Sequence, residues 1–314
     1  MGFIGSNLAR RLVELNNKVT VIDNLIPEHG GNPRNLHDLI DKISINLLDI
    51  RDENSIQEII KGHDFLFNLA GQTSHLDSME NPFLDLEINA KAQLSILEGC
   101  RRKNPEIRVV FASTRQIYGK PKYLPVDEKH PLHPVDVNGI NKIAGEQYHI
   151  LYHEVYGIAS SILRLTNTYG PRMRIKDARQ TFLGIWIKNL LEGKVIQVFG
   201  DGTQRRDYNF IDDVIDAFLI SATSDDAIGQ SFNLGSSDPL SLEATAKIMC
   251  DEINGAHYEL VPFPEERKAI DVGDFVCDYS AFSKSFGWNP KFSFEEGIAE
   301  SINFFRKELD YYLS

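Results

Sequence analysis

The feature that most constrains the fold of this chain is a pair of glycines, Gly2 and Gly5, at the start of a helical pattern. Apolar residues recur at helical spacing over residues 5–16, so the glycines would lie at a helix N-terminus. Backbone N–H groups there are free to bind phosphate, and glycine lets the ligand approach closely. We therefore predict a loop that binds the pyrophosphate of a dinucleotide. Its residues are Gly2, Phe3, Ile4 and Gly5.

The complete form of this motif is a buried strand followed by G-x-x-G-x-x-G. Gly2 and Gly5 match the last two glycines, so the first glycine and the strand before it fall outside this sequence. That strand would be the first of a doubly wound sheet and would lie near its centre. We predict that the first strand is missing from this chain and that the chain is aggregation-prone or cofactor-free as a result.

Short apolar runs alternate with amphipathic segments as far as residue 165. Near-continuous apolar strands between helices are typical of a parallel sheet that helices cover on both faces. This order predicts an α/β fold with a doubly wound parallel Rossmann sheet. The expected strands are 18–22, 44–48, 64–68, 108–113 and 160–165, and the expected helices are 5–16, 55–61, 84–102, 138–156 and 241–254.

The alternation loosens after residue 166, where Pro, Gly, Arg and aromatic residues cluster in loops. We assign residues 1–165 to a dinucleotide-binding Rossmann domain, to which residues 205–236 return. Residues 166–204 and 237–314 are assigned to a smaller α/β substrate-binding region.

The composition narrows the classes of partner. The net charge is −12, which disfavours a nucleic-acid surface. No apolar run approaches the roughly 18 residues of a membrane span, so we expect no membrane partner. The three cysteines show no pair spacing and there is no signal peptide, which favours the reducing cytoplasm. No cluster has metal-ligand spacing, and no metal is expected.

Ligands of an open parallel sheet bind at the carboxyl ends of its strands. Asp23 follows an expected strand, and a carboxylate there accepts hydrogen bonds from both ribose hydroxyls while repelling a 2′-phosphate. This favours NAD over NADP; the alternative is an aspartate in a turn. Asp49 and Ile50 follow the next strand, where they could meet an adenine edge. The predicted adenosine-binding residues are Asp23, Asn24, Asp49 and Ile50.

Further motifs follow along nearly the whole chain, and their order and spacing are more specific than any one of them. With them the chain resembles the extended short-chain dehydrogenase/reductases that act on nucleotide sugars, the general family of UDP-glucose 4-epimerase. The motifs are Asn68-Leu69-Ala70-Gly71, Phe111-Ala112-Ser113-Thr114, Lys142-x-x-Gly145-Glu146, Arg164-x-x-Asn167-x-Tyr169-Gly170-Pro171, Arg206-Asp207-Tyr208 and Gly287-Trp288-x-Pro290.

This resemblance implies that a hydride passes from a sugar carbon to NAD⁺ while a hydroxyl loses its proton. The family uses a Ser or Thr, which is Thr114 here, and a Tyr whose pKa is lowered by a Lys four residues on, which is Lys142. The Tyr position holds Asn138 instead. An amide does not titrate near neutral pH and cannot act as a base. By resemblance, Leu69, Ala70, Gly71 and Lys142 also bind the cofactor.

Three interpretations of Asn138 stay open. In the first, the proton of the sugar hydroxyl is taken by a water held by Asn138 and Thr114, or by another side chain such as Tyr118. In the second, the site performs a different reaction step. In the third, the site binds nucleotide sugar with little turnover. The dehydratases of the family have Asp and Glu after the Thr, and the decarboxylases keep a Glu at the second position. Here these residues are Arg115 and Gln116. We therefore favour epimerisation, at C4 through a keto intermediate, over elimination or decarboxylation.

The resemblance also implies the substrate contacts. Arg206 matches the family's diphosphate-binding Arg, and a planar guanidinium binds phosphate oxygens bidentately. Asn167 matches its sugar-diphosphate Asn, and Arg267 and Ser78 are further candidates. His75 could touch sugar hydroxyls, although a lone loop histidine is more often structural. The helices 84–102 and 138–156 match those that pair across a two-fold axis in the family, so we expect a homodimer.

Overall fold

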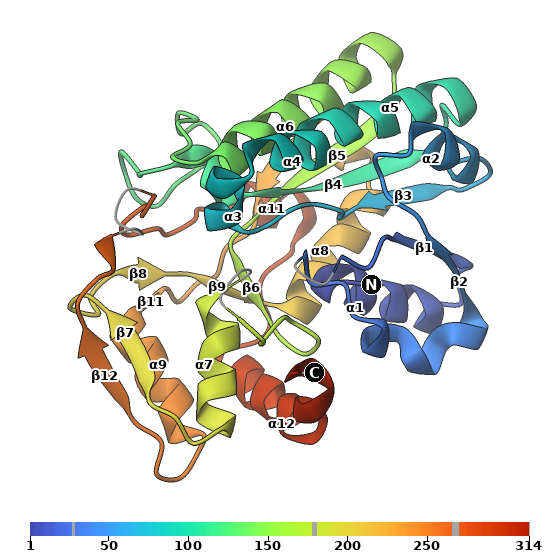
Figure 1. Ribbon diagram of the computed structural model, residues 1–314. Coiled ribbons are helices and arrows are strands. Elements are labelled where there is room, and N and C mark those ends of the chain that lie inside the picture. Colours follow the sequence, from blue (N-terminus) through green and yellow to red (C-terminus); the bar gives the residue numbers. More distant parts are fainter. Residues whose placement is uncertain (27–28, 178–180, 266–269, 314) are drawn as a thin grey trace.

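The computed structural model describes residues 1–26, 29–177, 181–265 and 270–313. Figure 1 shows a layered α/β molecule, with a parallel sheet between helices and a second group of helices and short strands at the lower left. The predicted α/β class with a parallel sheet is confirmed. Each predicted strand, and each predicted helix except 84–102, is present with its ends displaced by three residues or fewer.

The strands are β1 (Val19–Asp23), β2 (Ile43–Leu47), β3 (Phe65–Asn68), β4 (Arg108–Thr114), β5 (Ala159–Leu165), β6 (Asn167–Tyr169), β7 (Ile196–Phe199), β8 (Arg205–Arg206), β9 (Tyr208–Phe210), β10 (Ser231–Asn233), β11 (Leu240–Ser241) and β12 (Tyr258–Val261). The helices are α1 (Phe3–Glu14), α2 (Glu53–Ile59), α3 (His75–Glu80), α4 (Pro82–Leu86), α5 (Ala92–Lys103), α6 (Val137–Tyr156), α7 (Phe182–Leu191), α8 (Ile211–Thr223), α9 (Leu242–Asp251), α11 (Ser280–Phe286) and α12 (Phe294–Leu313). Short 3-10 or π-helical segments are η2 (Pro33–Lys42), η3 (Glu87–Lys91), η4 (Arg115–Tyr118) and η5 (Asp225–Ala227).

Four strands form the larger part of the sheet, in the order β10-β5-β4-β3, and all of their pairings are parallel. The inner residues of β4 and β5 are buried. Figure 1 shows α5 and α6 above these strands and α8 below them, and α6 and α8 both contact β4 and β5. Thr114 lies at the carboxyl end of β4, which is the edge of the sheet where ligands of such folds bind.

The strands β1 and β2 form a separate parallel pair. Within the part of the chain that the structure describes, neither of them pairs with β3. Residues of both β1 and β3 line one cavity of about 1790 Å³. A doubly wound sheet would have its first strand between these two edges. That such a strand is missing from this chain stays a prediction.

The predicted helix 84–102 is not a single α-helix. Its residues span the end of α4, the π-helical η3 and α5. Asn89 lies in η3, and its Nδ2 donates to the carbonyl of Gln72 (2.9 Å) and to Asp85 Oδ2 (3.0 Å). A π turn adds a residue to the helix and is frequent at functional sites. Here it lies beside the loop that follows β3.

The later part of the chain builds a second packing layer. β7 pairs with β12, β8 with β11 and β6 with β9. Buried side chains of α7, α9 and α12 join one apolar cluster with residues of β7 and β9. Arg206 of β8 and Asn167 of β6 line the cavity, so this layer supplies its second wall. The division of the chain into two domains stays a prediction.

Several large apolar side chains are exposed on α6 and on α4, which overlaps the start of the segment 84–102; the resemblance places the helices 84–102 and 138–156 at a dimer interface. These side chains are Phe83, Leu86, Ile140, Leu151, Val155 and Tyr156. The homodimer itself stays a prediction. No helix in the described ranges is both long and apolar enough to cross a bilayer.

Candidate active site

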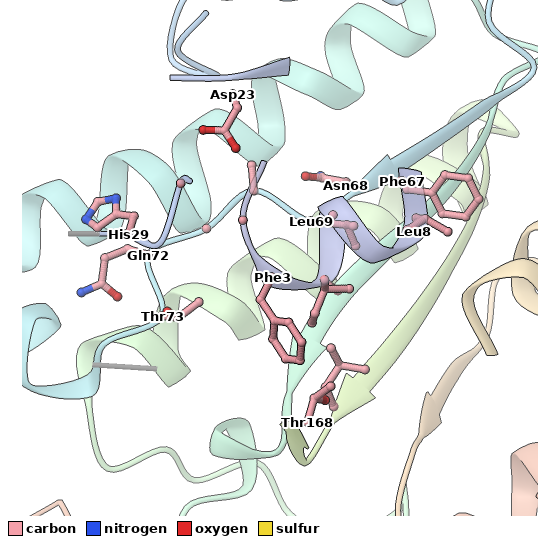
Figure 2. A pocket seen from close by; sticks show the side chains of 18 of the residues that line it. Phe3, Leu8, Asp23, His29, Phe67, Asn68, Leu69, Gln72, Thr73 and Thr168 are labelled. Carbon is pink, nitrogen blue, oxygen red and sulfur yellow. The ribbon is translucent and has the colours of Figure 1, made fainter. Parts of the chain in front are cut away.

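The candidate site is a long cavity at the carboxyl ends of the strands. It reaches from the β1–β2 pair past the start of α1 to α6 and to β6 and β8. Figure 2 shows Phe3, Asp23 and Leu69 around the start of α1, with Gln72 and Thr73 on the loop that follows β3. The cavity therefore brings the predicted dinucleotide residues together with the predicted catalytic ones.

The start of α1 faces the cavity through Gly2, Phe3, Ile4 and Gly5. The helix begins at Phe3, and its N-cap residue Gly2 supplies no side-chain hydrogen bond. A β-carbon on Gly5 would lie 3.8 Å from Leu69 Cδ1, so the loop after β3 runs close to this turn. Uncapped N–H groups at a helix N-terminus are suited to a pyrophosphate.

The predicted adenosine end lies at the carboxyl ends of β1 and β2. Asp23 Oδ2 forms an ion pair with the α-ammonium of Met1 at 2.5 Å, and its Oδ1 accepts the N–H of Leu25 at 2.7 Å. Asn24 Nδ2 donates to Asp49 Oδ2 (2.9 Å). Asp23, Asn24 and Asp49 all line the cavity, but Asp23 already has two partners. A ribose would have to share or displace the ammonium of Met1.

Asp49 is paired more tightly than the sequence suggests. Arg51 donates to both of its oxygens, at 2.9 Å through Nε and 2.6 Å through Nη2. These side-chain hydrogen bonds hold the pKa of Asp49 well below its ordinary value. Ile50, which follows it, lines the cavity, and its contact with an adenine edge stays a prediction.

Leu69, Ala70 and Gly71 line the middle of the cavity beside Lys142. A β-carbon on Gly71 would lie 2.9 Å from Asn89 Oδ1 and 3.2 Å from Lys142 Nζ, so glycine is required for this approach. Asn89 Oδ1 is buried without a hydrogen-bond partner. Lys142 Nζ donates to the Ala112 carbonyl (3.0 Å), and burial lowers the pKa of Lys142 to about 8.

Asn138, in the place of the family's tyrosine, is buried and has a defined orientation. Its Nδ2 donates to the Gln72 carbonyl (2.7 Å) and to Asp85 Oδ2 (3.2 Å). Both of these atoms accept hydrogen bonds, so the amide N–H₂ must face them. Asp85 is itself fully buried and also accepts from Asn89 and Asn141. The amide is thus a structural donor to a buried carboxylate, and the site has no base at this position.

Thr114 lines the cavity, and its Oγ1 accepts the N–H of Gln116 (3.2 Å). Tyr118 does not line it. Its hydroxyl donates to Asn233 Oδ1 (2.6 Å) and accepts from Arg164 Nη1 (2.8 Å), and its side chain is fully buried. Burial raises the pKa of Tyr118. The interpretation in which Tyr118 takes the substrate proton is therefore wrong.

Of the predicted substrate residues, Asn167 and Arg206 line the second wall of the cavity. Asn167 Nδ2 donates to the Asp207 carbonyl (2.9 Å), and Arg206 Nη2 lies 3.7 Å from Asp271 Oδ1. Ser78 is not among the cavity-lining residues: its Oγ donates to the His75 carbonyl (2.7 Å) and accepts the N–H of Asn138 (3.3 Å). It supports the start of α6 instead. Arg267 lies outside the described residues.

Sequence reasoning missed two carboxylates at the reaction end, Asp85 and Asp136. Asp136 is the N-cap of α6, and its Oδ1 accepts the N–H of Gly139 (2.7 Å). Its Oδ2 lies 2.9 Å from His75 Nδ1. An Asp before a predicted helix is a signal for an N-cap. Nothing in the sequence indicates that it also meets His75, 61 residues earlier in the chain by their numbers.

The described residues fit a dinucleotide, because an uncapped helix start, a glycine-only approach and a buried lysine follow one another along the cavity. Among these residues, no group of three or more His, Cys, Asp or Glu is placed to hold a metal ion.

Comparison with known proteins also indicates a dinucleotide-binding enzyme. Residues 1–235 match the model of the NAD dependent epimerase/dehydratase family. A protein of Methanocaldococcus jannaschii is 33% identical over 307 residues, which cover 97% of this chain and 96% of the relative. The UDP-glucose 4-epimerase of Mycolicibacterium smegmatis is 30% identical over 98% of this chain and 96% of its own. The structure of Thermotoga maritima UDP-glucose 4-epimerase with UDP-glucose is 30% identical, with a TM-score of 0.87 over 98% of this chain and 97% of that chain.

Proposed function

Because the chain belongs to the NAD-dependent epimerase/dehydratase family, we propose that it inverts C4 of a nucleoside-diphosphate sugar through a keto intermediate. NAD is the cofactor of this family, and the chemistry that it supplies when bound is reversible acceptance of a hydride. The observation that supports turnover most directly is the convergence of Thr114 and Lys142 on the cavity that holds the glycine loop.

The roles of this chain's own residues follow from their surroundings. Lys142 lies beside Gly71, where its ammonium can bind a ribose hydroxyl and stabilise negative charge that develops on a nearby oxygen. Thr114 Oγ1 can donate to the sugar oxygen that becomes a carbonyl. Arg206, across the cavity, supplies the cation that a diphosphate needs.

The residues after Thr114 support epimerisation over elimination of water. Elimination needs an acid for the leaving hydroxyl and a base for the adjacent carbon. Arg115 and Gln116 occupy these positions, and Gln116 Nε2 donates to Asp136 Oδ2 (3.2 Å) rather than offering a proton. Epimerisation needs only the redox step and room for the keto sugar to turn.

The test is conversion of a panel of UDP-, CDP-, GDP- and dTDP-sugars, read by chromatography of the sugar nucleotides. We expect one 4-epimer pair to interconvert, and Lys142→Met to abolish the conversion. A dehydrated or decarboxylated product would contradict the proposal. Tight binding of one sugar nucleotide without conversion would favour the second candidate, a silent nucleotide-sugar binding protein, which Asn138 in place of a base supports.

A further inference from the structure

An epimerase site requires a group that takes the proton of the sugar hydroxyl, and Asn138 cannot do so. The cavity offers a histidine close by. His75 begins α3, lines the cavity and keeps about a third of its side chain exposed (34%). Its Nδ1 lies 2.9 Å from Oδ2 of the buried Asp136. A half-exposed imidazole held by a buried carboxylate is the arrangement that orients a general base in many hydrolytic enzymes.

The partners of Asp136 decide which nitrogen of His75 carries the proton. Two groups face His75 Nδ1: Gln116 Nε2, which only donates, lies 3.3 Å away, and ionised Asp136 Oδ2, which only accepts, lies 2.9 Å away. The shorter contact favours a proton on Nδ1, and the Gln116 amide then donates to Asp136 Oδ2 (3.2 Å) instead. Hydrogen bonds from His75, Gly139 and Gln116 hold the pKa of Asp136 below its ordinary value although burial raises it, so the carboxylate stays charged. In the neutral ring the lone pair is then on Nε2. No described residue forms a hydrogen bond with Nε2, and this nitrogen is the basic one.

The surrounding contacts place His75 at the reaction end of the cavity. Asp136 caps the helix whose first turns carry Asn138 and Lys142. The His75 carbonyl accepts from Ser78 Oγ, which in turn accepts the N–H of Asn138. On the other side, Gln116 Nε2 lies 3.3 Å from His75 Nδ1, and its backbone N–H is bonded to Thr114. His75 is thus tied to both elements that present the predicted catalytic side chains.

We propose that His75, oriented by Asp136, is the general base of the reaction and replaces the tyrosine of the family. This inference rests on the proposed function. As the sugar carbon is oxidised, its C–H bond breaks and the electron pair leaves as hydride to the nicotinamide cofactor. The O–H bond breaks at the same time, its electron pair forms the C=O bond, and the proton moves to His75 Nε2. On the return step the imidazolium gives this proton back to the oxygen as the hydride returns to the other face.

The proposal predicts an acid limb in the pH dependence of turnover, because protonated His75 has no lone pair with which to accept a proton. Asp136 at the start of α6 is the charged group that contacts His75; Asp77 follows two residues later on α3, and Arg115 of η4 donates to Gln116 Oε1 (3.2 Å). Lys142 and Asp85 are buried charged groups of the same site, and the substitutions at His75 and Asp136 leave them unchanged.

The first experiment compares His75→Gln with the wild-type chain and with His37→Gln. His37 also meets an aspartate, since its Nδ1 lies 3.8 Å from Asp38 Oδ1, but it does not line the cavity. We expect His75→Gln to lower kcat by about 10²–10⁴-fold with KM little changed, the loss typical for a general base. The acid limb should disappear, and imidazole added to His75→Ala should restore part of the rate. His37→Gln should behave as wild type.

The second experiment needs no cofactor. Nitrogen chemical shifts of His75 in the free protein should report a proton on Nδ1. Asp136→Asn keeps an N-cap residue, because Asn caps helices as well as Asp does, but removes the charge. It should shift the proton toward Nε2 and lower kcat without unfolding α6. A resting proton on Nε2 in the wild-type chain would overturn the proposal.

The outcomes separate this inference from the proposed function. An active wild-type chain whose His75→Gln variant keeps its kcat and its acid limb would overturn the base and leave the epimerase standing. A wild-type chain that converts no sugar nucleotide would overturn both. Circular dichroism of each variant shows whether a loss reflects chemistry or unfolding.

Discussion

The four-stranded sheet and the separate β1–β2 pair differ in how completely their strands are covered. In β4 and β5 every inner residue is buried, whereas every residue of β1 is half-exposed, although Val19-Thr-Val-Ile-Asp23 has the β-branched composition of a central strand. β1 pairs only with β2, and its residues border the cavity. The exposure of a strand is thus decided by its neighbours as well as by its composition. The predicted adenosine end of the site lies at the half-exposed β1–β2 pair and is termed the open end. The predicted reaction end lies at the buried four-stranded sheet and is termed the packed end.

The largest effect is expected at the packed end, from Lys142→Met. The side chain is buried against the Ala112 carbonyl and Gly71, so its ammonium has no substitute nearby. We expect kcat to fall by about 10²–10³-fold, in the range for loss of a group that stabilises developing charge. NAD affinity, measured by calorimetry, should fall as well. Thr114→Val is the control, because it should reduce turnover and leave NAD affinity near wild type.

Asn138→Tyr tests whether the packed end lacks a base. The change removes one of the donors to buried Asp85, so we expect a loss of stability of about 1–3 kcal/mol in chemical denaturation. With His75 as the base, a new phenol is redundant and kcat should change by less than tenfold. Asn138→Leu is the control, because it removes the same donor and adds no hydroxyl. A large gain in kcat for the tyrosine variant alone would show that the site had no base before.

Filling the open end should have a smaller but measurable effect. An N-terminal extension of about ten residues, an apolar strand and a glycine turn, can pair with both β1 and β3, whose residues line the same cavity. It would also convert the ammonium of Met1, which is bonded to Asp23, into an amide. We expect NAD to bind at least about tenfold more tightly, a gain of about 1.4 kcal/mol. A Gly/Ser extension of equal length is the control, and equal affinity for all three proteins in calorimetry would show that the open edges do not limit binding.

The smallest effect is expected from Asp23→Ala at the open end. Since Met1 already neutralises this carboxylate, we expect NAD affinity to fall only several-fold in the present chain, well under the tenfold that corresponds to about 1.4 kcal/mol. The preference for NAD over NADP should narrow, because the repulsion of a 2′-phosphate is lost. In the extended chain, Asp23→Ala should lower NAD affinity by a larger factor than in the present chain. Tighter binding of NADP than of NAD by the extended protein would refute the assignment of Asp23 to the ribose.

The sequence by itself determined the elements and the family. Apolar periodicity located strands and helices such as α6 and β5 to within a few residues, because side chains on one face of an element must be buried together. The glycine pair and the ordered motifs along the chain indicated an NAD-dependent nucleotide-sugar enzyme. The sequence also showed that Asn138 interrupts the catalytic pattern.

Tertiary structure alone decided which side chains meet at the reaction end. The hydrogen bond from the Tyr118 hydroxyl to Asn233, those from Asn138 and Asn141 to Asp85, and the pairing of His75 with Asp136 all join residues that lie far apart in the chain. The half-exposure of β1 and the π turn at Asn89 likewise depend on packing against other elements. Local sequence fixes backbone preferences over a few residues, but a hydrogen bond between distant residues forms only where the folded chain brings a donor and an acceptor within reach.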